Sequence, residues 1–412
     1  MTMPLAEFEA RVRFVSEMAR RLHQYGTSAP RLESAIDKVS VRLGLNCNSL
    51  STPTSIILSY GSADDGPDAL PRFTQVLRVE PGEVNLRRLS ETDDIAERVY
   101  HGRLDVAQGL KLLQSLRAGL SPRGEALQVA CFAIASTTVS VLLGGGVADV
   151  LTATGLGLLI GLLGTLAGRS ESFAPSFELV AAFVATFGAS LVAALWVAIN
   201  VRSVVIAALI VLLPGLMLTT AVVELSTRHL VAGSVRFMGA VAILIKLTFG
   251  AVAGLQLAKV LDLGLTTTTS PALPGYATWI ALLAGTYSFA ILFQAARRDI
   301  PLAMASAWLG YLCTTYAGQA YGQEFGVFFA GLVVACAANL FARVCNRPGA
   351  IVRVPGIILL VPGSVGFRSL FFVFERDVYL GLDMAFALVI LLASLVAGLL
   401  LGNVLMPPRR SI

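Results

Sequence analysis

Two proline-glycine pairs, Pro214-Gly215 and Pro362-Gly363, lie in the middle of long apolar segments. Proline removes a backbone donor and glycine loosens the turn beside it, so each pair is expected to break a membrane-spanning helix. A broken helix leaves unpaired carbonyls and amides at membrane depth, and such groups are tolerated only where they line a polar cavity. Two breaks at equivalent positions therefore predict a substrate site between two structural repeats.

The composition divides the chain into two parts. Of its 412 residues 56% are hydrophobic and 14% charged, which is too apolar for a soluble globular protein. Of the 57 formal charges 31 fall within residues 1–124, which predicts a soluble domain ahead of a membrane domain. That domain has 16 basic and 15 acidic residues, so no polybasic surface suggests a nucleic-acid partner.

Residues 1–124 are expected to form a small cytoplasmic α+β domain. Hydrophobic periodicity and turn residues predict helices and strands in it. The helices are expected at about 8–24, 30–43, 90–100 and 104–116, and the extended segments at 45–50, 54–60 and 73–79, with a turn at 65–67.

No known catalytic or metal-binding motif occurs in the domain. It lacks a nucleophile elbow, a phosphate-binding glycine loop and a zinc-helix motif, so we expect no enzyme, no cofactor and no ATP-driven pump. The five cysteines are scattered, and His23, His101 and His229 lie far apart, so we expect no metal site. The mixed charges near the N-terminus do not resemble a cleavable signal peptide.

Ten apolar windows of about 20 residues follow, each long enough to cross a hydrocarbon core of about 30 Å. They are expected at 126–146, 147–167, 177–197, 203–223, 234–258, 275–294, 300–317, 325–344, 350–373 and 383–405. The two prolines are 148 residues apart, and the same shift superimposes other windows, although residue identity is otherwise poor. The fold class predicted is thus an all-α membrane domain of two five-helix repeats, 125–270 and 271–412.

An odd number of spans in each repeat makes the second repeat enter from the opposite side, so the repeats are expected to be inverted. The basic loop residues set the orientation, because such residues favour the cytoplasmic side. Loops expected inside carry Arg123, Arg169, Arg228, Arg297, Arg298, Arg343, Arg347, Arg409 and Arg410, and those outside carry Arg202, Lys259 and Arg376. Both termini are therefore predicted to be cytoplasmic, in a plasma (inner) membrane.

Three ionisable residues are candidates for ion coupling. Lys246 is expected near the centre of the fifth span, either as a counter-charge or protonation switch for transport or as one half of a structural ion pair. Asp149 follows a triple glycine, and it either faces a cavity or is a solvated helix cap. Glu224 follows the first break by ten residues, as an interfacial carboxylate or a coupling group.

Hydroxyls and one fixed charge lie within about two turns of the breaks: Thr219, Thr220, Ser364 and Arg368. Together with Pro214, Gly215, Pro362, Gly363 and Lys246 they form the predicted substrate site. The alternative for each hydroxyl is a bond back to its own helix, which is common in membrane spans. Arg368 could instead anchor its helix at the interface.

The chain resembles the threonine/serine exporter family. The resemblance rests on Gly26-Thr27-Ser28-Ala29 with Leu32-Glu33-Ser34-Ala35, Leu43-Gly44-Leu45, Leu142 to Gly146 with Asp149, Leu213-Pro214-Gly215 with Glu224, and Leu360-Val361-Pro362-Gly363-Ser364. It implies a soluble domain before ten spans and a secondary transporter that exports threonine and serine with the proton motive force. Partners would be a small solute, protons and lipid, with a homo-oligomer possible.

Two alternatives remain open at this point. Related two-chain systems are associated with export of dicarboxylates such as succinate, and a second cavity-facing cation beside Lys246, for example Arg368, would favour that substrate. A membrane-anchored sensor or enzyme would instead need a functional constellation in residues 1–124, and the sequence provides none.

Overall fold

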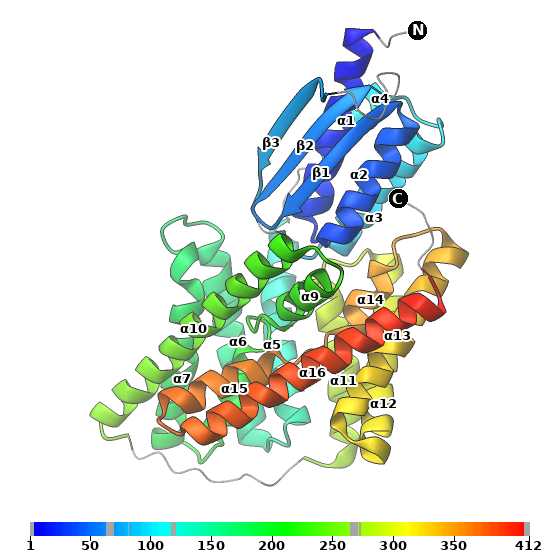
Figure 1. Cartoon of the computed structure of the whole chain (residues 1–412). Helices are drawn as coiled ribbons and strands as arrows, with labels where there is room; N and C mark the ends of the chain where they lie inside the picture. Colours follow the sequence, from blue (N-terminus) through cyan, green and yellow to red (C-terminus); the bar gives the residue numbers. More distant parts are fainter. Residues whose placement is uncertain are drawn as a thin grey trace.

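The structure is a computed structural model, and it describes residues 4–62, 70–80, 82–116, 121–263, 271 and 273–407. The turn expected at 65–67 and the two arginines at 409–410 lie outside these residues. A small domain with a sheet lies above a bundle of long apolar helices (Figure 1).

The small domain is α+β, as predicted. Its antiparallel sheet has the order β1-β2-β3, and the strand β2 alternates buried Ile56, Leu58 and Tyr60 with less buried residues. This period of two presents one face to the helices and builds the core with them. The elements are α1 (Leu5–Gln24), α2 (Ala29–Arg42), β1 (Leu45–Thr52), β2 (Ser55–Ser62), β3 (Phe73–Arg78), α3 (Leu86–Tyr100) and α4 (Val106–Ser115).

The rest of the described chain is helical. The helices are α5 (Pro122–Leu142), α6 (Val147–Ala167), α7 (Phe177–Leu195), α8 (Val201–Leu209), α9 (Gly215–Ser226), α10 (Leu230–Val260), α11 (Gly275–Leu292), α12 (Ile300–Tyr321), α13 (Gln323–Cys345), α14 (Ala350–Ile357), α15 (Gly363–Phe374) and α16 (Val378–Leu405), with single 3-10 turns at Ala174–Ser176 and Arg297–Asp299.

Seven helices of the described part are long and apolar enough to cross a membrane: α5, α6, α7 with its preceding turn, α10, α11, α13 and α16. This is fewer than the ten spans expected from sequence. The expected fourth and ninth spans are each divided into two short helices, α8 with α9 and α14 with α15, so neither meets the length of a span. The helix α12 covers the seventh expected span but is not among the seven.

Both proline-glycine pairs break their helices, as predicted. The break between α8 and α9 ends with Pro214 at φ −80° and ψ 39°, and the break between α14 and α15 ends with Pro362 at φ −83° and ψ 38°. Each following helix has 12 residues and begins at the glycine. A shift of 148 residues therefore carries α9 onto α15 end to end, with the same backbone geometry before each.

A second pair of glycine motifs follows the same shift. In α10, Gly250 packs so tightly on α7 that an added Cβ would lie 2.1 Å from the carbonyl oxygen of Leu179, and in α16 Gly398 would approach Phe328 equally closely. Each glycine is followed four residues later by another, Gly254 or Gly402, which also contacts the facing backbone. These G-x-x-x-G surfaces let two helix backbones approach closely.

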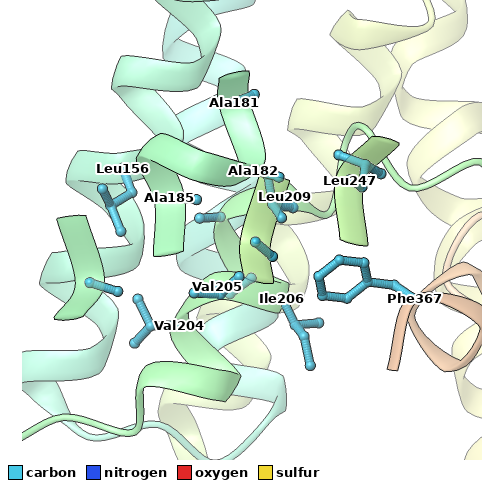
Figure 2. Packing of buried hydrophobic residues seen from close by; sticks show 14 of the residues in the cluster. Leu156, Ala181, Ala182, Ala185, Val204, Val205, Ile206, Leu209, Leu247 and Phe367 are labelled. Atoms are coloured by element: carbon cyan, nitrogen blue, oxygen red, sulfur yellow. The ribbon is translucent and has the colours of Figure 1, made fainter. Parts of the chain in front are cut away.

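The two halves share a buried core around α8. Residues 204–209 of α8 are buried on all sides, and Phe367 of α15 packs against the same cluster from the second half (Figure 2). Leu247 of α10 and the alanine face of α7 complete it (Figure 2). The first half of the broken helix is thus held in the interior rather than at the surface.

The close helix contact at Gly250 generates a prediction. Gly250→Ala should lower the melting temperature of the detergent-purified protein, because its Cβ would collide with the Leu179 carbonyl and overpacking costs about 1–3 kcal/mol. The matched control is Gly155→Ala in α6, whose Cβ would meet no atom within 4 Å. Equal melting temperatures for the two variants would contradict the assigned α7–α10 packing.

Candidate functional site: a contact between two broken helices

The two helix breaks touch each other. A Cβ on Gly215 would lie 3.0 Å from the amide nitrogen of Gly363, and a Cβ on Gly363 would lie 3.0 Å from both the amide nitrogen and the Cα of Gly215. Both glycines and both preceding prolines are buried. The sequence placed each break separately, and the structure brings them together as one site at which α9 and α15 begin with their amino-terminal ends adjacent.

The hydroxyls near the breaks differ in their bonding. Thr219 donates to the Gly215 carbonyl at 3.1 Å and Thr220 to the Leu216 carbonyl at 2.9 Å, so both threonines bond back to their own helix. Ser364 is half-buried in the first turn of α15. All three hydroxyls, which the sequence predicts to contact the substrate, lie within about two helical turns of the contact between Gly215 and Gly363.

Arg368 lies on α15 and is exposed. It lines a cavity of about 500 Å³, here termed the outer cavity, together with residues of α7, α8 and α10. The loops around this cavity are among those expected on the outer side, and two further cations, Arg202 and Lys259, line it too.

Lys246 forms an ion pair with the first turn of a neighbouring helix. Its ammonium donates to Glu178 Oε2 at 2.9 Å and to the Pro175 carbonyl at 3.1 Å, and its side chain is 34% exposed. The 31 residues of α10 extend past the start of α7, so Lys246 lies level with the first turn of α7. The structural ion pair left open by the sequence is therefore present.

Asp149 is buried rather than solvated, at 2% exposed. It accepts the Gly146 amide at 2.9 Å, which caps α6, and the Asn200 amide at 2.7 Å, at the start of α8. The carboxylate thus fixes the first half of the broken helix to the α5–α6 turn.

Glu224 joins the soluble domain to a broken helix. It is fully buried at 0% exposed near the end of α9, and Arg236 of α10 holds it through two bonds of 2.9 and 3.1 Å. The Glu224 Oε1 also accepts the backbone amide of Ala29 at 3.0 Å, where α2 of the soluble domain begins. A carboxylate at a helix amino terminus is stabilised by the free amides and the dipole there.

A histidine–carboxylate contact lies beside this ion pair. The His229 Nε2 is 3.4 Å from Glu33 Oε2, and Glu33 also accepts the Ser51 amide at 2.7 Å. His23 lies nearby, and its pKa is lowered, chiefly because the imidazole is buried. The small domain thus contacts both the end of α9, through the Ala29 amide, and the α9–α10 loop, through Glu33 and His229.

The soluble domain contacts the second half as well. The amides of Leu86 and Arg87 donate to the carbonyls of Phe293 and Gln294 after α11. Before α14, Arg347 holds Asp299 through two bonds of 2.6 Å and donates to Ser90 Oγ at 3.3 Å.

A polar cavity of about 330 Å³ lies at this second contact, between α3 and the α13–α14 loop. Asp93 lines it, and burial raises the pKa of that carboxyl to about 6, opposed by Arg31 at 3.7 Å. The domain therefore covers loops from both halves of the helical region.

Sequence reasoning missed Arg353. It lies inside α14, five residues before the second break begins, and donates to the side-chain oxygens of Asn339 at 2.9 Å and Asn403 at 3.1 Å. Its Nε is buried without a partner, and within the described ranges no carboxylate pairs with it. The signal available in the sequence was a single arginine in the apolar run that leads into the second break.

These features define a class: a polytopic membrane protein whose halves meet at a pair of broken helices beneath a small α+β domain. The comparisons identify the family. The family model described as a putative threonine/serine exporter matches residues 13–258, and a second model described as a threonine/serine exporter matches residues 278–405. The chain belongs to the threonine/serine exporter family, as the sequence resemblance indicated, and this is a family of membrane exporters rather than of enzymes.

Curated relatives match most of the chain. The chain is 26% identical to pheromone-regulated membrane protein 10 of Eremothecium gossypii, over 90% of this chain and 50% of the relative, and 28% identical to that of Saccharomyces cerevisiae, over 90% and 48%. It is 26% identical to the protein of the same name from Candida albicans, over 90% of this chain and 34% of the relative. The chain thus spans half or less of the length of these relatives. No solved structure matches it.

The buried Glu224 cluster generates a prediction. Glu224→Ala should destabilise the protein by about 3–5 kcal/mol, because it leaves Arg236 uncompensated and the start of α2 without an acceptor. Hydrogen exchange should also rise selectively at the first turn of α2. The matched control is Glu125→Ala, which breaks an exposed pair with Arg169 and should cost at most about 1 kcal/mol. Unchanged exchange in α2 of the Glu224 variant would contradict the assigned role.

Proposed function

We propose that this chain is a secondary active transporter that exports threonine, serine and similar small amino acids across the plasma membrane by alternating access. The observation that carries the proposal is the contact between the two breaks. Two helix amino termini that begin at one buried point bring their first turns and two positive dipole ends together, an arrangement suited to a solute carboxylate.

The proposed architecture is ten spans in two inverted repeats, with α8–α9 and α14–α15 as the fourth and ninth. The support is threefold: the shift of 148 residues between the breaks, the equivalent G-x-x-x-G surfaces of α10 and α16, and the reciprocal contact of Gly215 with Gly363. A reciprocal contact between equivalent residues is what a two-fold axis produces. Such an axis in the membrane plane would relate inverted repeats.

The proposed orientation places the soluble domain and both termini in the cytoplasm. The soluble domain contacts the loops after α9, after α11 and before α14, and basic residues led us to expect all three loops inside. The outer cavity lies among loops expected on the other side. In this arrangement the domain covers the inner mouth while the outer cavity leads away from the breaks.

The proposed site consists of the two proline-glycine pairs with Thr219, Thr220, Ser364 and Arg368, and Lys246 as a further charge. The backbone amides of the breaks would bind the solute carboxylate, and the threonines could bind a solute hydroxyl only by giving up their helix carbonyls. Asp149, Glu224 and Lys246 remain the candidates for proton coupling. Each is paired in this structure, so coupling would require that its partner be exchanged during transport.

A dicarboxylate exporter is the second candidate. The observation in its favour is that Arg368 lines a cavity with two other cations, since a dicarboxylate needs more positive charge than a zwitterion does. A sensor in which only the soluble domain acts is less well supported, because the paired breaks lie outside that domain.

Variants of the breaks test the transport proposal. Pro214→Ala and Pro362→Ala should each reduce export by about tenfold or more, because they allow the helix to continue through the break and remove the free amides. The assay is counterflow in proteoliposomes with threonine, serine and succinate in competition, with and without a pH gradient. Gly275→Ala, whose Cβ would meet no atom within 4 Å, is the control. Wild-type rates in both proline variants, correctly inserted, would refute the mechanism.

The lysine-glutamate pair allows coupling to be separated from structure. Lys246→Ala should abolish proton-linked efflux or uncouple it from protons. If the pair is structural, Lys246→Ala and Glu178→Gln should lower the stability of the protein by comparable amounts. The double variant restores stability in either case, because no unpaired charge remains. Proton-linked efflux that returns to the wild-type level in the double variant would remove Lys246 from the coupling site.

A further inference from the structure

The outer cavity has the electrostatic character of an anion site. Three cations, Arg202, Lys259 and Arg368, line it with one carboxylate, Glu375. Arg202 pairs with Glu375 at 3.1 Å, whereas neither Lys259 nor Arg368 has an ion pair within the part of the chain that the structure describes. The cavity therefore carries two uncompensated positive charges, in walls that are largely apolar and that strengthen their attraction for an anion.

A buried hydroxyl in the cavity wall lacks a partner. Thr186 of α7 is 2% exposed, and its Oγ1 makes no hydrogen bond within the described structure. Other buried threonines in the apolar helices, such as Thr219 and Thr248, donate to the carbonyl four residues earlier. Since an unpaired buried hydroxyl costs about 1–3 kcal/mol, the Thr186 hydroxyl is available to a ligand in the cavity.

The cavity begins about one helical turn beyond the second break. Phe367 and Arg368 follow Gly363 by about one turn of α15, and the opposite wall includes the first turn of α8. Asp149 fixes that turn through its bond to the Asn200 amide. The first turn of α8 thus lines the cavity, with the Asn200 amide bonded to Asp149 and the Ser203 amide to the Asn200 side chain.

We propose that the outer cavity is a binding site for the carboxylate of a small solute, with Arg368 and Lys259 as its charge partners and the Thr186 hydroxyl as a further hydrogen-bonding group. The identification of that solute with the exported one rests on the proposed function. A phospholipid headgroup would offer the same anionic chemistry from the bilayer, and the experiment separates these two sources.

The test is equilibrium binding of radiolabelled L-threonine and succinate to the full-length protein in nanodiscs of phosphatidylcholine alone. Arg368→Gln should weaken binding of at least one probe by about tenfold or more, as expected for loss of a charge-assisted hydrogen bond. The control Arg376→Gln removes the same charge eight residues further on, outside the cavity lining, and should leave affinity within about twofold of wild type.

Thr186→Val separates ligand binding from folding. The valine is similar in shape and no hydrogen bond is lost within the protein, so the melting temperature should be unchanged or higher while affinity falls by a few-fold. A fall in melting temperature with unchanged affinity would assign the hydroxyl to structure and contradict its part in the site.

The outcomes distinguish this inference from the proposed function. Wild-type binding affinity together with wild-type export in Arg368→Gln and Lys259→Gln would overturn the inference. The proposal that the chain is a transporter would stand. Carboxylate binding that depends on Arg368 without any export would overturn the transport proposal alone. No binding of either probe by the wild type would overturn the inference. Phosphatidylglycerol that copurifies with the wild type but not with Arg368→Gln would assign the cavity to lipid and also overturn it.

Discussion

The contact of Gly215 with Gly363 is the constraint on which the rest of the helical region depends. The backbones of two broken helices can meet there only because neither residue has a side chain, and a Cβ on either would lie within 3.1 Å of the other glycine. The two half-helices that begin at this contact, α9 and α15, each pack against the long last helix of the opposite half (Figure 1). A small-residue contact thus fixes the relation between the two halves of the molecule.

The soluble domain is attached to that contact through α9. Its α2 amino terminus binds Glu224 near the end of α9, while the beginning of the same helix forms half of the break contact. Because α9 has only 12 residues, the bond to the small domain and the break contact lie at opposite ends of one short helix.

Much of the fold followed from periodicity and breakers in the sequence. The α+β domain, both helix breaks and the equivalence at a shift of 148 residues could be predicted, since proline acts locally and hydrophobic windows report burial. The position of Lys246 could not, because it depends on how far α10 extends past α7. Arg353 was missed for a related reason: only its packing between Asn339 and Asn403 distinguishes it from an interfacial arginine.

The sequence by itself determined where the helices break, because the missing proline amide acts on its own segment whatever surrounds it. It also established the family, from motifs spread along the chain. Only the tertiary structure decided that the breaks touch, that Asp149 and Glu224 are buried in bonds to other elements, and that Arg368 shares a cavity with Lys259. These are contacts between segments far apart in the chain, and no local pattern of residues encodes which of them meet.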